Sequence, residues 1–173
     1  EGIMKNSGVG SDAGGDIVTT EQFKNFELYL EWKIAPKSNS GVFYHVQEGV
    51  SRAIYESGPE YQLIDDAGWP GKLKDSQASG ANYDMHALAG GKVKPIDEWN
   101  STRIVVYGPH VEHWLNGVRV LSYDLGTPRM NELLTRSKYR GIEGFADKRD
   151  GHVVLQDHTD AAWFRNIKIR RLS

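Results

Sequence analysis

The chain has 173 residues, with 21 basic and 23 acidic side chains and a formal net charge of -2. This length suits a single domain over residues 1–173 that buries roughly 70% of its unfolded surface, and the absence of cysteine excludes disulfides and thiolate metal sites. The charge balance argues against nucleic acid or an anionic membrane as a partner, since both require a basic patch, and no apolar run approaches the ~18 residues of a membrane span.

The N-terminal segment, residues 1–16, is rich in glycine and poor in apolar residues. We therefore expect mostly loop here, and the segment has no apolar stretch of the signal-peptide kind. From Phe26 to Ile34 apolar residues occupy every second position, and a period of two indicates a strand with one buried face. Comparable runs follow along the chain. We expect strands over 26–34, 40–47, 60–64, 101–107, 111–115, 118–123, 153–156 and 164–172.

Three connecting segments complete the predicted fold. Asn116 and Gly117 lie between two alternating runs, which is the strongest short signal for a hairpin. Residues 65–97 are long and irregular, and a loop of this length in a compact domain is more often functional than accidental. The only helix that we expect covers 128–138. Many strands and almost no helix predict an antiparallel all-β sandwich rather than an α/β protein.

Polar, aromatic and ionisable residues gather near the ends of several predicted strands. A core does not need such a cluster, whereas a sugar-like ligand does. Aromatic faces can hold its ring, and amide, carboxylate, imidazole and guanidinium groups can hold its hydroxyls. The clustered residues are Gln156, Asp157, His158, Trp163, Phe164 and Arg165, with a second group at His113, Trp114 and Asn116.

Glu60 and Gln62 lie two residues apart on one predicted strand, so they share a face. Tyr61 and Leu63 point the other way. If the Tyr61 face belongs to the core, Glu60 and Gln62 face either solvent or a groove. The spacing alone favours an ordinary solvated face.

Asp157 and His158 are open to three interpretations. They could form a carboxylate-oriented base, they could be metal ligands, or Asp157 could simply cap backbone amides in a loop. Their spacing matches no zinc signature, and no phosphate-binding glycine motif or GxSxG motif occurs in the chain. Tyr83, Asp84 and His86 lie in the long loop, where the tyrosine and the histidine could close over a ligand. Arg165 could serve a structural ion pair, and Trp114 could be either core or a stacking platform.

Six segments in a fixed order carry a resemblance to a known family: GGDIVTTEQFKNFELYLEWKI, NSGVFYHV, EYQLIDD, SGANYDMHA, KPIDEWNSTRIVVYGPHVEHWLNG and LQDHTDAAWFRNIKIRRL. Short pieces such as NSG are weak signals, but the ordered set with EWN, HWLNG and QDH…WFRNI is specific. Through these segments the chain resembles the 3-keto-disaccharide hydrolase family over nearly all of its length.

This resemblance implies a concanavalin A-like jelly roll, two antiparallel sheets with a concave ligand groove. It also implies a secreted or periplasmic protein that cleaves glycosides oxidised at C3. Such a ketone acidifies the proton on C2, so a base can remove it and the C1 leaving group departs. This chemistry needs a base, an electrophile for the enolate oxygen and an acid, but not the paired carboxylates of ordinary glycosidases.

The resemblance also implies which residues form the site. Glu60 and His158 are expected as base and acid in either order, and a cation such as Ca²⁺ could bind through Asp157 and Glu60, although no cofactor is required. The implied catalytic residues are Glu60, His158, Asp157 and His113, and the implied substrate-binding residues are His45, Gln62, Tyr83, Trp114, Gln156, Trp163 and Arg165.

Two other functions compete with this one. A lectin-like carbohydrate-binding module can share the same sandwich, because fold alone does not settle function. An ordinary endoglucanase of this fold would usually show two glutamates on one strand, and the EYQ segment offers only Glu60. A lectin has no need of ionisable groups with perturbed pKa values around one pocket. Their arrangement in space therefore discriminates between these functions.

Overall fold

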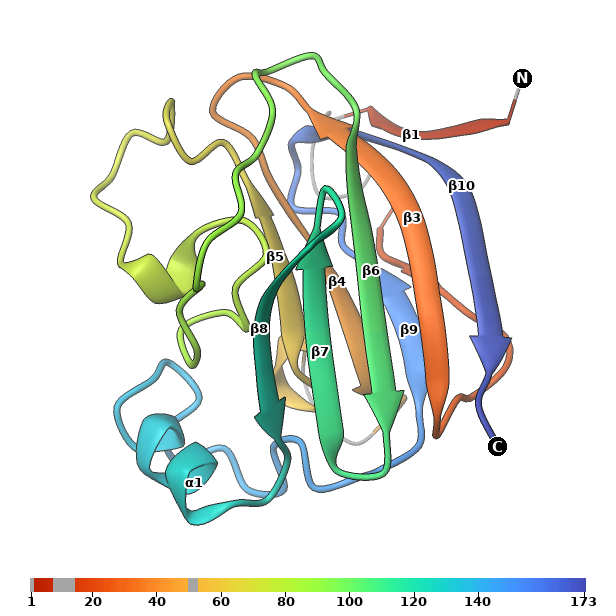
Figure 1. The fold of residues 1–173 in the computed structure, drawn as a ribbon, viewed down its shortest axis with the longest axis vertical. Helices are drawn as coiled ribbons and strands as arrows, with labels where there is room; N and C mark the ends of the chain where they lie inside the picture. Colours follow the sequence, from red (N-terminus) through yellow and green to blue (C-terminus); the bar gives the residue numbers. More distant parts are fainter. Residues whose placement is uncertain (1, 8–14, 50–52) are drawn as a thin grey trace.

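In a computed structural model, described over residues 2–7, 15–49 and 53–173, the chain forms two antiparallel sheets packed face to face (Figure 1). The larger sheet has the strand order β1-β10-β3-β6-β7-β8, and the smaller one has the order β2-β9-β4-β5. The elements are β1 (Ile3–Ser7), β2 (Ile17–Val18), β3 (Phe26–Ile34), β4 (Asn39–Val46), a 3₁₀ turn (Ile54–Glu56), β5 (Glu60–Ile64), a second 3₁₀ turn (Asp75–Gln77), β6 (Asn100–Tyr107), β7 (His110–Leu115), β8 (Val118–Asp124), α1 (Pro128–Leu134), β9 (His152–Leu155) and β10 (Ala161–Arg171).

The larger sheet has one buried and one partly exposed face. In β3 the residues at every second position from Phe26 to Ile34 are buried, and those between them are half-buried. The strand β6 alternates in the same way. This is the burial that a period-two pattern dictates when one face of a sheet packs on a core and the other faces solvent.

The smaller sheet is covered on both faces. All five residues of β5 are buried, and so is nearly all of β4. Val42, Tyr61 and Leu63 belong to the core between the sheets, whereas Phe43 and Val154 form a separate apolar cluster. Because successive side chains of a strand point to opposite faces, this second cluster marks the outer face of the smaller sheet.

The predicted all-β fold of two antiparallel sheets is confirmed, and each predicted strand is present to within a few residues at its ends. The prediction of mostly loop over 1–16 is wrong for Ile3–Ser7, a strand that pairs with β10, while residues 8–14 lie outside the described part of the chain. The polar β1 has no alternating apolar pattern, and its pairing with β10 defines it as a strand.

The structure confirms the sequence signals for the hairpin turn and for the start of the helix. Asn116 and Gly117 both have positive φ angles, 49° and 81°, as the β7–β8 hairpin requires. The helix α1 begins after Thr127, whose side chain accepts a hydrogen bond from the Met130 amide, and it is shorter than predicted. None of the helices in the described ranges is both long and apolar enough to cross a membrane.

Candidate active site around Glu60

Glu60 and Gln62 lie on the outer face of the smaller sheet, opposite the core face of Tyr61. On the neighbouring strand β4, Phe43 pairs with Glu60 and Gly41 pairs with Gln62. On the other side of β4 the Gln156 amide donates a hydrogen bond to the Gly41 carbonyl at 2.9 Å. Directly opposed residues of an antiparallel pair share a face, so Gln62, Gly41 and Gln156 form a row across three strands.

Gly41 makes room for the Glu60 carboxyl. A Cβ atom at position 41 would lie 2.5 Å from Glu60 Oε1 and 3.2 Å from its Cδ. Only the missing side chain allows the carboxyl to lean over the β4 backbone. Glu60 is 3% exposed, so the sheet and its cover hold this carboxyl away from bulk water.

A lysine and two tyrosines face the Glu60 carboxyl. Lys138 Nζ lies 4.0 Å from Glu60 Oε2 and 4.2 Å from the centre of the Tyr83 ring, with the rings of Tyr55 and Tyr139 at 4.8 Å and 5.2 Å. Lys138 and Tyr139 come from the segment after α1, and Tyr83 comes from the long loop after β5. The three aromatic faces stabilise the ammonium group near the carboxyl.

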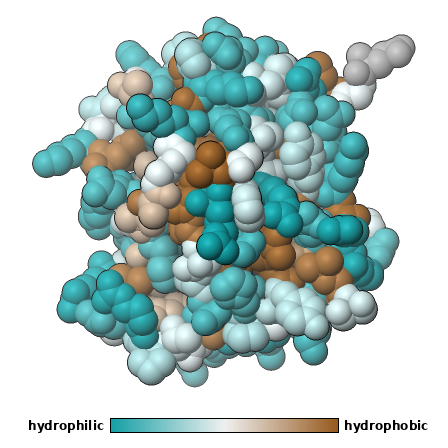
Figure 2. Space-filling view, viewed as in Figure 1, coloured by the Kyte–Doolittle hydropathy of each residue, from teal (hydrophilic) through white to brown (hydrophobic). Residues whose placement is uncertain are grey.

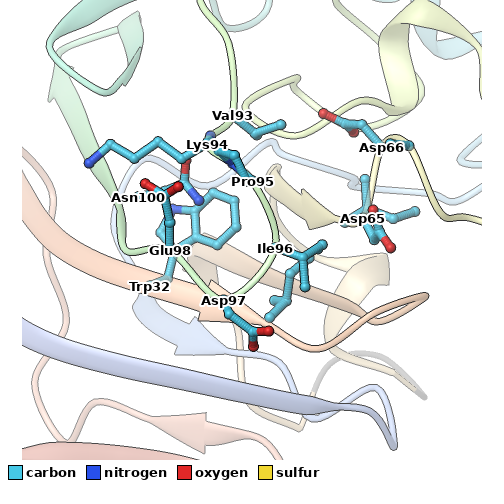
Figure 3. Close-up of a pocket in the computed structure, with 13 residues that line it drawn as sticks. Trp32, Asp65, Asp66, Val93, Lys94, Pro95, Ile96, Asp97, Glu98 and Asn100 are labelled. Carbon is cyan, nitrogen blue, oxygen red and sulfur yellow. The ribbon is translucent and has the colours of Figure 1, made fainter.

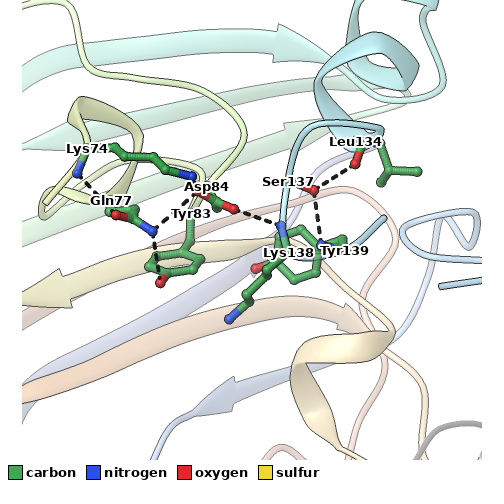
Figure 4. A network of polar contacts seen from close by, with 8 residues as sticks. All are labelled: Lys74, Gln77, Tyr83, Asp84, Leu134, Ser137, Lys138 and Tyr139. Atoms are coloured by element: carbon green, nitrogen blue, oxygen red, sulfur yellow. Dashed lines mark hydrogen bonds and ion pairs between the residues drawn. The ribbon is translucent and has the colours of Figure 1, made fainter. Parts of the chain in front are cut away.

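Asp84 joins these two segments (Figure 4). Its carboxylate accepts a hydrogen bond from the Lys138 backbone amide at 2.7 Å and forms an ion pair with Lys74 Nζ at 3.0 Å. Gln77 donates to both Asp84 and the Tyr83 hydroxyl. The backbone at Lys138 is therefore held against the long loop, and its side chain remains available to face Glu60.

Burial dominates the electrostatics of this cluster. It raises the pKa of Glu60 from 4.5 to about 7, against the lowering effects of the Lys138 charge and the Tyr139 hydroxyl. Burial also lowers the pKa of Lys138 and raises that of Tyr83. A carboxyl that titrates near neutrality is suited to proton transfer, because it can both take and return a proton at working pH.

Three amide side chains on this sheet carry a buried polar atom without a hydrogen-bond partner in the described structure: Gln62 Nε2, Gln156 Oε1 and Asn39 Oδ1. Gln62 Oε1 already accepts from the Leu63 amide at 3.0 Å, so the free atom of Gln62 is a donor. Buried polar atoms are normally paired. A row of unpaired amides beside a buried carboxyl is suited to a ligand that carries hydroxyl groups.

The structure thus brings together four of the predicted site residues: Glu60, Gln62, Tyr83 and Gln156. Sequence reasoning missed Lys138, Tyr139, Gly41 and Asn39. Lys138 and Tyr139, at the end of the predicted helix, are a weak signal, because nothing in the sequence shows that this segment folds back over β5.

His113 does not join this cluster, because it lies between the two sheets. It is fully buried, its Nδ1 donates to the Gly80 carbonyl at 2.9 Å, and its Nε2 accepts from the Tyr44 hydroxyl at 2.9 Å. Burial lowers the pKa of His113 to about 3. The imidazole is neutral and has both nitrogens engaged inside the core, on the other side of the smaller sheet from Glu60.

His45 also lies inside the protein. It is 1% exposed, packs edge-on against Phe26, and its Nε2 hydrogen-bonds to the Lys24 carbonyl at 3.1 Å. Its positive φ of 55° marks the irregularity in the pairing of β4 with β9. In this position His45 contacts backbone and core rather than the Glu60 cluster.

Asp157 and His158 lie on the connection after β9. Asp157 accepts hydrogen bonds from Asn6, from the Gly15 amide and from the Thr159 amide, which is the backbone-capping arrangement. The His158 side chain is 47% exposed, and its Nδ1 lies 3.7 Å from Asp160. These contacts tie the connection together and do not bring His158 to Glu60.

Trp114, Trp163 and Arg165 lie on the outer face of the larger sheet. Arg165 forms an ion pair with Glu31 at 2.5 Å, Trp163 lies under Lys33, and Trp114 donates to Glu112 at 2.9 Å. In the view of Figure 2 this sheet lies in front, and hydrophilic residues cover most of it with hydrophobic patches between them. The two sheets therefore separate these residues from Glu60.

A cavity of about 280 Å³ lies elsewhere, beside the end of β5 and the long loop (Figure 3). Trp32, Ile64 and Ile96 contribute apolar surface, and Asp66 and Asp97 contribute carboxylates. Lys94 also lines this cavity, but its Nζ donates a hydrogen bond to the Trp99 carbonyl at 2.9 Å. Lys138 Nζ, in contrast, faces the buried Glu60 carboxyl, so we place the candidate active site at Glu60. Among the described residues, no group of three or more His, Cys, Asp or Glu side chains could hold a metal ion.

Comparison with known proteins agrees with an enzymatic site on a β-sandwich. Residues 1–170 match the family described as the 3-keto-alpha-glucoside-1,2-lyase-like domain. A 3-keto-disaccharide hydrolase of Bacteroides thetaiotaomicron is 37% identical over 199 aligned positions, which cover 99% of this chain and 69% of the relative.

Solved structures give the same result. A protein from Parabacteroides distasonis, assigned to the glycosyl hydrolases, superposes with a TM-score of 0.90 at 35% identity and covers 99% of this chain and 81% of its own. A Bacillus subtilis protein with a galectin-like fold has a TM-score of 0.53 at 14% identity over 90% of this chain and 77% of its own, a likeness of fold alone.

The fold and the relatives define the chain as a β-sandwich enzyme of the glycoside hydrolase class. Within that class, it belongs to the 3-keto-alpha-glucoside-1,2-lyase-like family.

Proposed function

We propose that this enzyme cleaves glycosides whose sugar carries a ketone at C3, with the Glu60 carboxylate as the base that removes the proton from C2. The observation that carries the proposal is the Glu60 carboxyl, which is buried beside Lys138. Burial raises the pKa of this carboxyl to about 7. The name of the Bacteroides relative supports the same substrate class.

The neighbours of Glu60 favour elimination chemistry over ordinary glycoside hydrolysis. Ordinary glycosidases use two carboxyl groups that flank the glycosidic bond. The side chains that shift the pKa of Glu60 are a lysine and a tyrosine, not a second carboxylate. A single base next to a cation matches the needs of C2 deprotonation beside a ketone.

The unpaired amides provide the binding part of the site. Sugar hydroxyls can both donate and accept, so different hydroxyls of one sugar can satisfy the Gln62 donor and the Gln156 acceptor, which lie on either side of β4. Asn39, two residues before Gly41 on β4, extends this surface along the strand. We expect the oxidised sugar to lie over Gly41, with C2 toward Glu60.

The first experiment follows sugar release from a 3-keto-disaccharide and from its unoxidised parent, with wild-type enzyme, Glu60→Gln and the control Glu112→Gln. Glu112 lies on the outer face of the larger sheet. We expect cleavage of the keto form alone, a loss of about 10²-fold or more in Glu60→Gln, and no change in the control. Because the base must be ionised, kcat/KM should rise with pH through about 7.

Cleavage of both substrates at similar rates would contradict the keto requirement. Binding of the keto-disaccharide without cleavage would favour a non-catalytic carbohydrate-binding module instead. We also propose that the protein acts outside the cytoplasm, as its resemblance to secreted and periplasmic proteins implies, and fractionation of producing cells tests this.

A further inference from the structure

We propose that Lys138 is the electrophile of this reaction: its ammonium group holds the C3 oxygen while that oxygen carries the negative charge of the enolate. The inference rests on the proposed function. The resemblance implied Arg165 as a substrate-binding residue, and a guanidinium group could also have held the enolate oxygen. Arg165 lies on the outer face of the larger sheet, paired with Glu31, so this role requires another cation.

The position of Lys138 fits the geometry of the step. The atoms C2 and the C3 oxygen of the substrate are neighbours, so the base and the electrophile must lie a few ångströms apart. Lys138 Nζ lies 4.0 Å from Glu60 Oε2, which is beyond direct hydrogen-bonding distance. This separation leaves the ammonium free to donate to a substrate oxygen beside the carboxyl.

The environment of Lys138 keeps its donors available. Nζ lies within 5.2 Å of the ring centres of Tyr55, Tyr83 and Tyr139, and ring faces attract the charge without accepting conventional hydrogen bonds. No hydrogen bond from Nζ is present within the described ranges of the chain. The side chain is 38% exposed, so a ligand can approach it.

The backbone that carries Lys138 is fixed on both sides (Figure 4). Asp84 accepts the Lys138 amide at 2.7 Å, and the Ser137 hydroxyl accepts the Tyr139 amide at 3.1 Å while donating to the Leu134 carbonyl at 2.9 Å. A charge held in place before the reaction stabilises a developing oxyanion without reorganisation.

The reaction proceeds through an enolate, and it needs no oxidant or reductant. The Glu60 carboxylate takes the C2 proton, the C–H electron pair forms the C2=C3 bond of the enolate, and the C3 oxygen becomes negative against Lys138. The C3=O bond then re-forms as the C1=C2 bond forms and the C1–O bond breaks. The departing oxygen takes a proton from protonated Glu60 or from water, and water adds across C1=C2 to give the free 3-keto sugar.

The test compares Lys138→Met with Lys168→Met, since Lys168 is an exposed lysine of β10 on the larger sheet, outside the Glu60 cluster. Two rates are measured across pH: cleavage of a 3-keto-disaccharide, and exchange of the C2 proton of 3-keto-glucose in D₂O, which needs no leaving group. We expect Lys138→Met to lower both plateau rates at high pH by about 10²- to 10³-fold, with Lys168→Met unchanged.

The pH plateau separates this role from a merely structural ion pair. The charged and titratable groups facing Lys138 are Glu60, Asp84, Tyr55, Tyr83 and Tyr139. If Lys138 only lowers the pKa of Glu60, its loss moves the rise of the rate to higher pH but leaves the plateau rate at high pH unchanged. That result overturns the inference.

Two further outcomes are distinguishable. If the wild-type enzyme does not cleave the keto-disaccharide, the proposed function fails and the role of Lys138 falls with it. If the wild type cleaves and Lys138→Met keeps its plateau rate, the function stands and only this inference fails. Lys138→Gln, which keeps polarity without charge, provides the same comparison where the Met variant does not fold.

Discussion

The pKa values of two glutamates of this chain shift in opposite directions because their surroundings differ. The Arg103 and Arg170 guanidinium groups pair with Glu27 on the outer face of the larger sheet and lower its pKa. Glu60 is enclosed, and burial raises its pKa to about 7. The residue type is the same, so the difference in pKa comes from the surroundings: arginine partners at Glu27 and burial at Glu60.

Gly41→Ala tests whether the close approach of Glu60 to the β4 backbone matters for activity. The new Cβ would lie 2.5 Å from Glu60 Oε1, so the carboxyl must swing away. We expect kcat/KM to fall by about tenfold or more, because misplaced catalytic groups react slowly. Because the displaced atom ends a flexible side chain, the free energy of unfolding should change by less than about 1 kcal/mol.

Gly71→Ala is the matched control, since its added Cβ meets the Trp69 ring at ordinary contact distances. Retained activity in Gly41→Ala, with the structure intact, would show that the carboxyl need not lean over β4. Steady-state kinetics and urea unfolding of both variants make the comparison.

At the scale of elements, the site is assembled from segments that are far apart in the chain. The strand β5 supplies Glu60, the long loop supplies Tyr83, and the segment after α1 supplies Lys138. Asp84, with a positive φ of 55°, joins the last two. A functional loop positioned against a rigid sheet is the usual way in which such sites are built.

Asp84→Ala should loosen the segment that carries Lys138 without removing any group that touches the substrate. We expect kcat/KM to fall by about tenfold, whereas Asp84→Asn should keep most of the activity, because its amide oxygen can still accept the Lys138 amide. Hydrogen exchange of residues 135–140 measures the loosening directly. Equal activity in both variants would show that this hydrogen bond does not position the lysine.

At the scale of the whole molecule, a buried polar chain connects the two sheets. The Tyr44 hydroxyl of the smaller sheet contacts both His113 and Tyr123 of the larger one. Burial lowers the pKa of His113 to about 3 and that of the neighbouring His86 to about 4. These imidazoles are neutral when folded and take up protons on unfolding below their ordinary pKa of 6.5.

The sign of the pH dependence follows from these lowered values. Stabilisation by neutral His113 is fully present above pH 6.5 and is lost progressively as the pH falls toward 3. His113→Gln should therefore be less stable at pH 7.5 by roughly 1–3 kcal/mol, from lost hydrogen bonds. Between pH 7.5 and pH 5 the free energy of unfolding falls in both proteins, and the fall should be about 2 kcal/mol smaller in His113→Gln than in the wild type.

Urea unfolding at the two pH values measures this difference, and His110→Gln, an exposed histidine of the same strand, is the control. KM should stay unchanged in His113→Gln. A large loss of kcat with unchanged stability would instead support a catalytic role for His113, as the family resemblance implied.

The sequence alone determined the strands, the β7–β8 hairpin and the two-sheet class, because burial on one face produces a local period-two pattern and Asn-Gly suits a positive-φ turn. It also singled out Glu60, Gln62, Tyr83 and Gln156. Only the tertiary structure decided that Glu60 is enclosed and that Lys138 faces it, while the sheets separate both residues from Arg165 and Trp163. The physical reason is that strand alternation specifies the two faces of a strand, whereas the cover over each face depends on contacts between distant segments.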